Sequence, residues 1–151
     1  MQNAKTNLHF AFCILHFMKL NHLAIAVNDL DAALKFYQDA LGVHCERIET
    51  VDAEGVKVAF LPLENGEIEL MQPTRESGIT KWLAKHGQGI HHLCVETPDI
   101  EAAMQRLAAN GAELITPKPV QRENGTRYAF VHPKSAFGVL IELYEVAQRG
   151  L

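Results

Sequence analysis

The sequence has little of what marks several specialised protein classes. Its 151 residues include three cysteines without a Cys-x-x-Cys spacing, so we expect no disulfide scaffold, no zinc ribbon and a reducing, cytoplasmic location. The most apolar segment, residues 8–17, is too short to cross a bilayer, which takes about 20 residues. No Walker loop, GxGxxG or Gx-Ser-xG motif occurs, so the sequence supports neither nucleotide hydrolysis nor serine-type acyl transfer.

Charge is sparse and mixed in sign. The 14 Lys and Arg residues are scattered, and the formal net charge is -4, which argues against a nucleic-acid or anionic-membrane surface. With 48% hydrophobic and 21% charged residues, the composition is that of a globular chain, and the length fits one domain. We therefore expect a small molecule as the partner.

Residues 1–17 differ from the rest of the chain. They contain one Lys, and they have neither the cleavage site of a secretory signal nor the Arg and Ser residues of a transit peptide. A strand-like pattern begins at Met18. We therefore expect Met18 to be the native start, residues 1–17 to be an extension, and one domain to cover residues 18–146.

The chain repeats itself. A shift of 70 residues, which carries His22 onto His92, superposes HLAIAVNDLDAAL on HLCVETPDIEAAM. Both halves also end in an Ile-Glu-Leu triplet, at residues 68–70 and 141–143. An unrelated pair of βα units would also show an apolar strand followed by an Ala-rich helix. It would not be expected to match a His, an Asp and an Ile-Glu-Leu triplet in the same order. The pattern therefore predicts two duplicated modules.

Each half predicts the same elements. In the first, residues 19–27 alternate like a strand, Asn28 and Asp29 supply a helix cap, and a helical apolar period runs from Leu30 to near Gly42. Three further strands are predicted at residues 43–49, 56–62 and 67–71.

The second half predicts a strand at 91–97, a helix at about 99–110, and strands at 112–116, 126–131 and 138–145. The linker, about residues 73–89, contains a short predicted helix at 80–86. The predicted fold is therefore α+β, with two tandem βαβββ modules at about residues 19–72 and 90–145.

The duplication places His and Glu at equivalent positions: His22 and Glu69 in the first module, His92 and Glu142 in the second. Each His opens the first strand of its module, and each Glu lies between apolar neighbours in the last strand. If those neighbours face the helices, strand alternation turns both Glu side chains to the opposite face. A pseudo-twofold pairing of the modules would bring all four side chains together.

Two imidazoles and two carboxylates predict a divalent-metal site for Co, Mn, Ni, Fe(II) or Zn, with two positions left for water or substrate. A lone strand His or Glu is more often structural, but four ligand types matched in pairs favour the metal site. His91 competes with His92 as a ligand. Since His92 alone is in register with His22, we interpret His91 as a structural residue or as a support for the ligand.

Modules of this kind, with His and Glu at these positions, resemble the vicinal-oxygen-chelate superfamily. That superfamily includes glyoxalase I, extradiol dioxygenases, fosfomycin-resistance proteins and methylmalonyl-CoA epimerases, and the resemblance here is to the epimerases, over about residues 18–145. Its most specific stretches are WLAKH at 82–86, GIHHL at 89–93, and HPKS at 132–135 followed by GVLIEL at 138–143. Glyoxalases tend instead to carry an Asp-Pro-Asp-Gly type of turn where this chain has HPKS.

The resemblance implies a glyoxalase-like domain whose metal cleft uses His22, Glu69, His92 and Glu142 to hold the ion. The ion would bind the thioester carbonyl and the carboxylate of a methylmalonyl group. The implied reaction interconverts the two C2 stereoisomers of methylmalonyl-CoA through an enolate. Some epimerases carry Gln at the position of Glu69, and some carry a catalytic carboxylate at the position of Val58.

Epimerisation needs one group that removes a proton from one face of C2 and another that returns a proton to the other face. A divalent ion would stabilise the enolate as a Lewis acid, so the base can be a modest one. We expect Glu142 to be one acid/base and Glu69 the other, because the pseudo-twofold would place them on two sides of the substrate. The alternatives are a water molecule or Glu46, Glu49 or Glu54.

For the coenzyme A part of the substrate, Lys134 and Ser135 are candidate phosphate contacts, and a solvated turn is the alternative interpretation. Arg122, Arg127 and Lys118 are not assigned to a site. We expect a homodimer that binds an acyl-CoA and has no nucleic-acid or membrane partner.

Two other functions are compatible with the same fold. A glyoxalase-like lactoylglutathione lyase would use the same four ligands; Glu rather than Gln at position 69 favours it, and the HPKS stretch argues against it. A metal-free, drug-binding protein would keep the cleft without the ion. The presence of all four ligand types argues against this second alternative.

Overall fold

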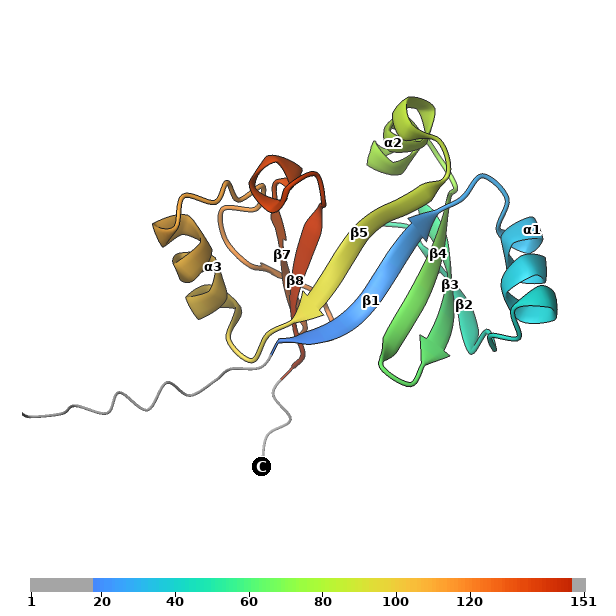
Figure 1. The fold of residues 1–151 in the computed structure, drawn as a ribbon, viewed down its shortest axis with the longest axis horizontal. Coiled ribbons are helices and arrows are strands. Elements are labelled where there is room, and N and C mark those ends of the chain that lie inside the picture. Colours follow the sequence, from blue (N-terminus) through green and yellow to red (C-terminus); the bar gives the residue numbers. More distant parts are fainter. Residues whose placement is uncertain (1–17, 148–151) are drawn as a thin grey trace, which may run out of the picture.

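The computed structural model of the chain describes residues 18–147, so the predicted extension at residues 1–17 lies outside the described part. The first half contains β1 (Lys19–Ala26), α1 (Leu30–Leu34), β2 (Arg47–Val51), β3 (Val56–Leu63) and β4 (Gly66–Pro73). The second contains β5 (Gly89–Glu96), α3 (Ile100–Ala109), β6 (Val120–Gln121), β7 (Arg127–Val131) and β8 (Ile141–Glu145). Helix α2 (Gly78–His86) connects the two halves (Figure 1).

Two predicted strands differ from the structure. Helix α1 continues as a π-helical segment, η1 (Lys35–Ala40), and the chain joins the sheet only at Arg47, so the strand predicted at 43–49 is β2 at Arg47–Val51. The strand predicted at 112–116 is reduced to an isolated bridge at Leu114. The backbone N–H groups of Ile115 and Thr116 both point to the carbonyl oxygen of Phe130, at 2.8 and 3.4 Å, so a regular ladder does not continue there.

All strands belong to one eight-stranded sheet with the order β2-β3-β4-β1-β5-β8-β7-β6. The halves meet where β1 runs antiparallel to β5, and in this pair Leu23 lies opposite Leu93. On either side of that pair, His22 lies opposite Cys94, and Ala24 lies opposite His92. Because these positions exchange under the 70-residue shift, the pseudo-twofold axis passes through the Leu23–Leu93 pair and relates the two halves of one chain.

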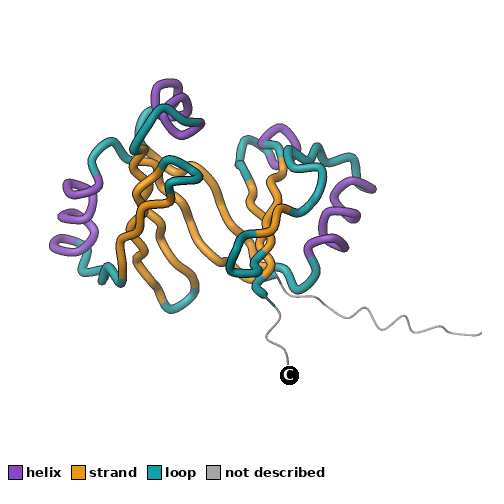
Figure 2. The backbone as a smooth tube through the Cα atoms, turned by 180° about the vertical axis from the view of Figure 1, so that it is seen from behind, coloured by secondary structure: helices purple, strands orange, loops and turns teal. Residues whose placement is uncertain are grey.

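The helices α1 and α3 lie on the two flanks of the sheet (Figure 2). Each helix begins at a capping aspartate of the repeat: Asp29 accepts the N–H of Ala32 at 3.0 Å, and Asp99 accepts that of Ala102 at 2.9 Å. None of the helices within residues 18–147 has the length and apolar character that a membrane-spanning helix needs.

The core of each half lies between its helix and the sheet. Leu70 of β4 packs in one buried cluster with Leu30 of α1, and Leu143 of β8 packs in another with Ile100 and Met104 of α3. Because successive strand residues point to opposite faces, Glu69 and Glu142 lie on the face turned away from α1 and α3.

Candidate metal centre

Four side chains meet on this face of the sheet, which is turned away from α1 and α3, and each comes from a different strand. Glu69 belongs to β4, His22 to β1, His92 to β5 and Glu142 to β8. These four strands are adjacent in the middle of the sheet. The structure therefore places all four residues that the repeat singled out on one face of the sheet, and we refer to these candidate ligands as the metal centre.

The donor atoms of three of these side chains form a tight triangle. Nε2 of His22 and Nε2 of His92 lie 3.0 Å apart, and Oε2 of Glu142 lies 3.4 Å from the former and 3.0 Å from the latter. Neighbouring ligands at about 2.1 Å from an octahedral ion lie about 3.0 Å apart, so this triangle has the dimensions of one face of a coordination sphere. Glu69 does not join this triangle: its Oε1 lies 3.4 Å from Nδ1 of His22, the ring nitrogen that Asn21 also contacts.

His22, His92 and Glu142 are buried and Glu69 is partly buried, and the charges of these side chains interact strongly. Burial, opposed by His22, raises the pKa of Glu69 to about 7. Burial also acts to raise the pKa of Glu142, but hydrogen bonds from His22 and His92 outweigh it and lower that pKa to about 2. Burial would lower the pKa of His22, yet its contact with Glu142 raises it. The buried carboxylates thus require a positive charge beside them, which protons or a cation supplies.

The donor set fits a divalent transition metal. Two imidazoles and two carboxylates provide two nitrogen and two oxygen ligands, a mixture that suits Co, Mn, Ni, Fe(II) or Zn. The burial of the ligands holds them in place before an ion arrives. The remote Nδ1 atoms also have partners, since Asn21 Oδ1 lies 2.8 Å from Nδ1 of His22, and Nδ1 of His91 lies 2.9 Å from Nδ1 of His92.

The structure adds one potential donor that the sequence did not indicate. The thiol of Cys94 has its sulfur within 4.8 Å of ligand atoms of both His22 and Glu142. Cys94 lies two residues after His92 on the same strand, so strand alternation was the signal that could have found it. Its fully buried position raises the pKa of the thiol, which opposes ionisation.

The alternative proton-transfer residues lie farther from the metal centre. Val58, which is buried, packs with Phe60 and Met71 on this face of the sheet, where Ile79 of α2 also contacts the cluster, and this part of the face is apolar. Glu46 and Glu49 are exposed and pair with Arg47. Glu54 reaches the centre indirectly, because it lies 3.3 Å from Arg122, which in turn lies 3.5 Å from Glu142.

The two residues predicted to contact coenzyme A lie in η2 (Pro133–Ala136), the turn between β7 and β8. The side chain of Lys134 is exposed. The hydroxyl of Ser135 accepts the backbone N–H of Glu113 at 2.8 Å, so it already has a structural role. The structure contains no direct contact between these residues and the four side chains of the metal centre within its described part.

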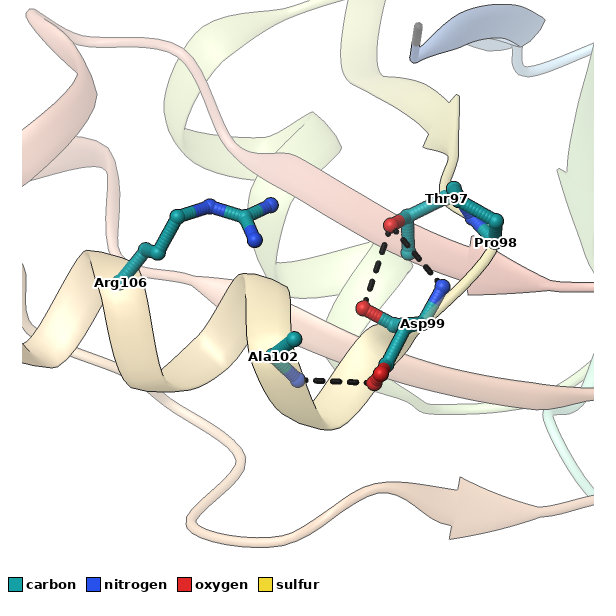
Figure 3. Close-up of a pocket in the computed structure, with 5 residues that line it drawn as sticks. All are labelled: Thr97, Pro98, Asp99, Ala102 and Arg106. Carbon is teal, nitrogen blue, oxygen red and sulfur yellow. Dashed lines mark hydrogen bonds between the residues drawn. The ribbon is translucent and has the colours of Figure 1, made fainter. Parts of the chain in front are cut away.

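A separate hollow lies at the start of α3 and is lined by Thr97, Pro98, Asp99, Ala102 and Arg106 (Figure 3). Its polar groups serve the helix end: Asp99 caps α3, and the Thr97 hydroxyl donates to the Asp99 carbonyl oxygen at 3.2 Å. No residue of the metal centre lines it, so we do not assign it to the site.

Comparisons with known proteins agree with this architecture. Residues 21–130 match the model of the glyoxalase/bleomycin resistance protein/dioxygenase superfamily. The chain is 41% identical over 131 residues to the ethylmalonyl-CoA/methylmalonyl-CoA epimerase of Cereibacter sphaeroides, covering 85% of this chain and 98% of the relative.

Solved structures lead to the same group of proteins. Methylmalonyl-CoA epimerase from Mycobacterium tuberculosis superposes with a TM-score of 0.76 at 39% identity, over 85% of this chain and 88% of the other. A methylmalonyl-CoA epimerase in complex with methylmalonyl-CoA and NH4+ superposes with a TM-score of 0.78 at 33% identity, over 87% and 96%. The chain therefore belongs to the glyoxalase/bleomycin resistance protein/dioxygenase superfamily, and within it to the relatives of methylmalonyl-CoA epimerase.

Proposed function

We propose that this protein is a methylmalonyl-CoA epimerase, which interconverts the two C2 stereoisomers of its substrate through an enolate. The observation that carries the proposal is the convergence of His22, Glu69, His92 and Glu142 on four adjacent strands. A relative that is 41% identical to this chain is an epimerase for ethylmalonyl-CoA and methylmalonyl-CoA, which supports the choice of substrate.

In this proposal, His22, Glu69, His92 and Glu142 hold a divalent ion of the Co, Mn, Ni, Fe(II) or Zn type. A bound ion supplies Lewis-acid stabilisation of the negative charge that develops on the thioester oxygen of the substrate. The hydrogen at C2 lies between a thioester and a carboxylate and is only weakly acidic, so that stabilisation lets a carboxylate act as the base.

Glu142 and Glu69 exchange the C2 proton on opposite faces of the substrate. Hydrogen bonds from the two imidazoles lower the pKa of Glu142 to about 2, so this carboxylate is ionised but weakly basic, and its action as a base depends on Lewis-acid stabilisation of the enolate. The raised pKa of Glu69, about 7, suits a group that gives and takes a proton near neutrality. Val58 carries no group that transfers protons. Glu69 and Glu142 are the carboxylates that contact the imidazoles.

Lys134 and Ser135 would contact the phosphates of coenzyme A from the η2 turn, and we expect the active assembly to be a homodimer. The exposed ammonium of Lys134 is free to pair with a phosphate. The Ser135 hydroxyl would have to add this contact to its present one with Glu113.

The test is hydrogen exchange at C2. The Co-loaded protein is incubated with one stereoisomer of methylmalonyl-CoA in deuterated water, and the product is analysed by NMR and mass spectrometry. We expect deuterium at C2 and both stereoisomers, whereas the thiol hemiacetal of methylglyoxal and glutathione should not be converted. His22→Ala should lose exchange, and the matched control His44→Ala, a change of an exposed His outside the metal centre, should retain it. Turnover of the hemiacetal with no exchange at C2 would identify a glyoxalase-like lyase instead.

A further inference from the structure

Arg122 is held at the edge of the metal centre by the fold around it. It directly follows β6, and a tight turn fixes its backbone: its N–H donates to the Thr126 carbonyl oxygen at 2.8 Å, and its carbonyl oxygen accepts the N–H of Gly125 at 3.0 Å. The turn requires the positive φ of Gly125, 82°. The backbone thus directs the Arg122 side chain towards the sheet.

The guanidinium group lies over aromatic rings on the face of the sheet that carries the metal centre. Its central carbon is 4.3 Å from the ring centre of Tyr128 and 5.9 Å from that of Tyr144. Tyr128 and Tyr144 are opposite one another in the β7–β8 ladder, and Tyr144 lies two residues after Glu142, so these rings share the face of the metal centre. Stacking of this kind orients the plane of the guanidinium group.

Arg122 is connected to the metal centre through Glu142. Oε1 of Glu142 lies 3.5 Å from Nη2 of Arg122, whereas Oε2 of the same carboxylate contacts both ligand imidazoles. Nη2 also lies 3.3 Å from Oε1 of Glu54, in the turn between β2 and β3 of the other half. Among the ion pairs of residues 18–147, no other Lys or Arg contacts a side chain of the metal centre.

The guanidinium has hydrogen-bonding capacity to spare. Both of its contacts use Nη2, and within the described part of the chain Nε and Nη1 have no hydrogen-bond partner. The side chain is 34% exposed, so these donors are open to a ligand. Two parallel N–H groups of an arginine match the two oxygens of a carboxylate.

Charge balance gives these donors a role. The two carboxylates of the metal centre neutralise a divalent ion, so an acyl group that carries its own carboxylate adds a negative charge to a buried face. Burying that charge without a partner is costly. Arg122 can neutralise this charge. It lies next to the imidazoles, because one oxygen of Glu142 contacts Arg122 and the other oxygen contacts both rings.

We propose that Arg122 binds the carboxylate of the acyl group and makes the protein selective for carboxylated acyl thioesters over uncharged ones. This inference rests on the proposed function and adds a specificity-determining residue to it. Without substrate, Glu54 occupies one donor of Arg122. With substrate, the acyl carboxylate, which would also bind the ion, accepts hydrogen bonds from the remaining donors of Arg122.

The experiment compares two ligands that differ by one carboxylate. Dissociation constants of malonyl-CoA and propionyl-CoA are measured by calorimetry on the Co-loaded protein, on Arg122→Gln and on Arg106→Gln, with the metal content of each sample determined. Arg106, an exposed arginine on α3 (Figure 3), receives the same chemical change away from the metal centre. The preference for malonyl-CoA should fall by about 10- to 100-fold in Arg122→Gln, the range expected for a hydrogen-bonded charge pair.

Propionyl-CoA should bind Arg122→Gln as it binds the unchanged protein, Arg106→Gln should keep the full preference, and Glu54→Gln should keep or increase it. An equal loss of affinity for both ligands in Arg122→Gln, or a loss of metal, would assign Arg122 a purely structural role and overturn the inference. An unchanged preference would overturn it as well. If the unchanged protein itself binds malonyl-CoA no better than propionyl-CoA but still exchanges deuterium at C2 of methylmalonyl-CoA, this inference fails while the proposed function stands; the absence of exchange at C2 would refute the proposed function.

Discussion

Asn21 and His91 occupy equivalent positions in the two modules, and each contacts Nδ1 of the ligand His that follows it. Asn21 Oδ1 lies 2.8 Å from Nδ1 of His22, and His91 Nδ1 lies 2.9 Å from Nδ1 of His92. The duplication has therefore kept both the ligand and the group that orients it. As a result, both rings turn Nε2 to the centre of the site, where these atoms lie 3.0 Å apart.

These contacts predict that Asn21 and His91 contribute to metal affinity without binding the ion. Asn21→Ala and His91→Phe should each weaken Co binding by about 10- to 100-fold, the usual effect of removing a group that orients a ligand His. The measurement is competition with a chelator of known affinity. His44→Phe is the matched control for His91→Phe, because His44 is exposed and outside the site. An unchanged affinity in both variants would show that neighbouring packing alone orients the rings.

Removal of the metal should lower thermal stability as well as activity. A ligand that binds the folded state at 100 times its dissociation constant adds about 2.7 kcal/mol to the free energy of unfolding. For a domain of this size we therefore expect chelation to lower Tm by about 5 °C or more, measured by calorimetry. Exchange at C2 should cease with the loss of metal and return with Co or Mn. Full exchange activity in the thoroughly chelated protein would contradict the role assigned to the four ligands.

Two independent patterns in the sequence pointed to the same four candidate ligands, and the structure places these residues on four adjacent strands. The 70-residue repeat matched His22 with His92, and strand alternation put Glu69 and Glu142 on the face away from their apolar neighbours. The structure also accounts for the pairing of the modules, which the sequence left open. Leu23 and Leu93 meet at the pseudo-twofold axis in the β1–β5 ladder of a single chain.

The remaining features lay outside these patterns. Arg122 follows a strand of two residues and has no counterpart in the repeat, so no periodicity could place its side chain. Cys94 corresponds to Ala24 in the first module. Because Ala24 is not a metal-ligand type, the search for matched pairs of ligands did not identify Cys94. The first helix ends close to the predicted position, but the start of β2 was predicted too early because Val43 packs against that helix, and its N–H donates to the Tyr37 carbonyl oxygen at 2.8 Å, instead of entering the sheet.

Glu145 is expected to be important for stability rather than for catalysis. This buried carboxylate accepts the N–H of Ile100 at 2.8 Å and pairs with Arg127 at 2.7 Å, so it ties the start of α3 to the end of β8. Glu145→Ala removes the acceptor for both the Ile100 N–H and the Arg127 side chain. This change should lower the free energy of unfolding by about 2–3 kcal/mol in urea denaturation. Glu101→Ala removes the exposed partner of Arg127 and should cost less than about 1 kcal/mol. If both changes lowered the free energy of unfolding equally, the hydrogen bond from Ile100 to Glu145 would contribute nothing to stability.

Glutamine substitutions separate metal binding from proton transfer at Glu142 and Glu69. Glu142→Gln keeps an oxygen that binds metal but cannot accept a proton at neutral pH, so Co should largely stay bound. Exchange at C2 of the stereoisomer whose proton Glu142 removes should nevertheless fall by about a hundredfold, a typical effect of losing a general base. Metal content is measured by atomic emission, and exchange is measured in deuterated water.

Glu69→Gln shows whether the second proton uses the equivalent carboxylate. If Glu69 and Glu142 serve opposite faces of the substrate, each variant should exchange deuterium with only one stereoisomer of methylmalonyl-CoA, and the two variants should favour opposite isomers. Exchange with both isomers in Glu69→Gln would assign the second proton to another group. Glu54 would then be the candidate, because it pairs with Arg122, and Arg122 contacts Glu142. Undiminished exchange of both isomers in Glu142→Gln would refute the two-carboxylate mechanism, because the base with the closest contacts to both imidazoles would then be dispensable.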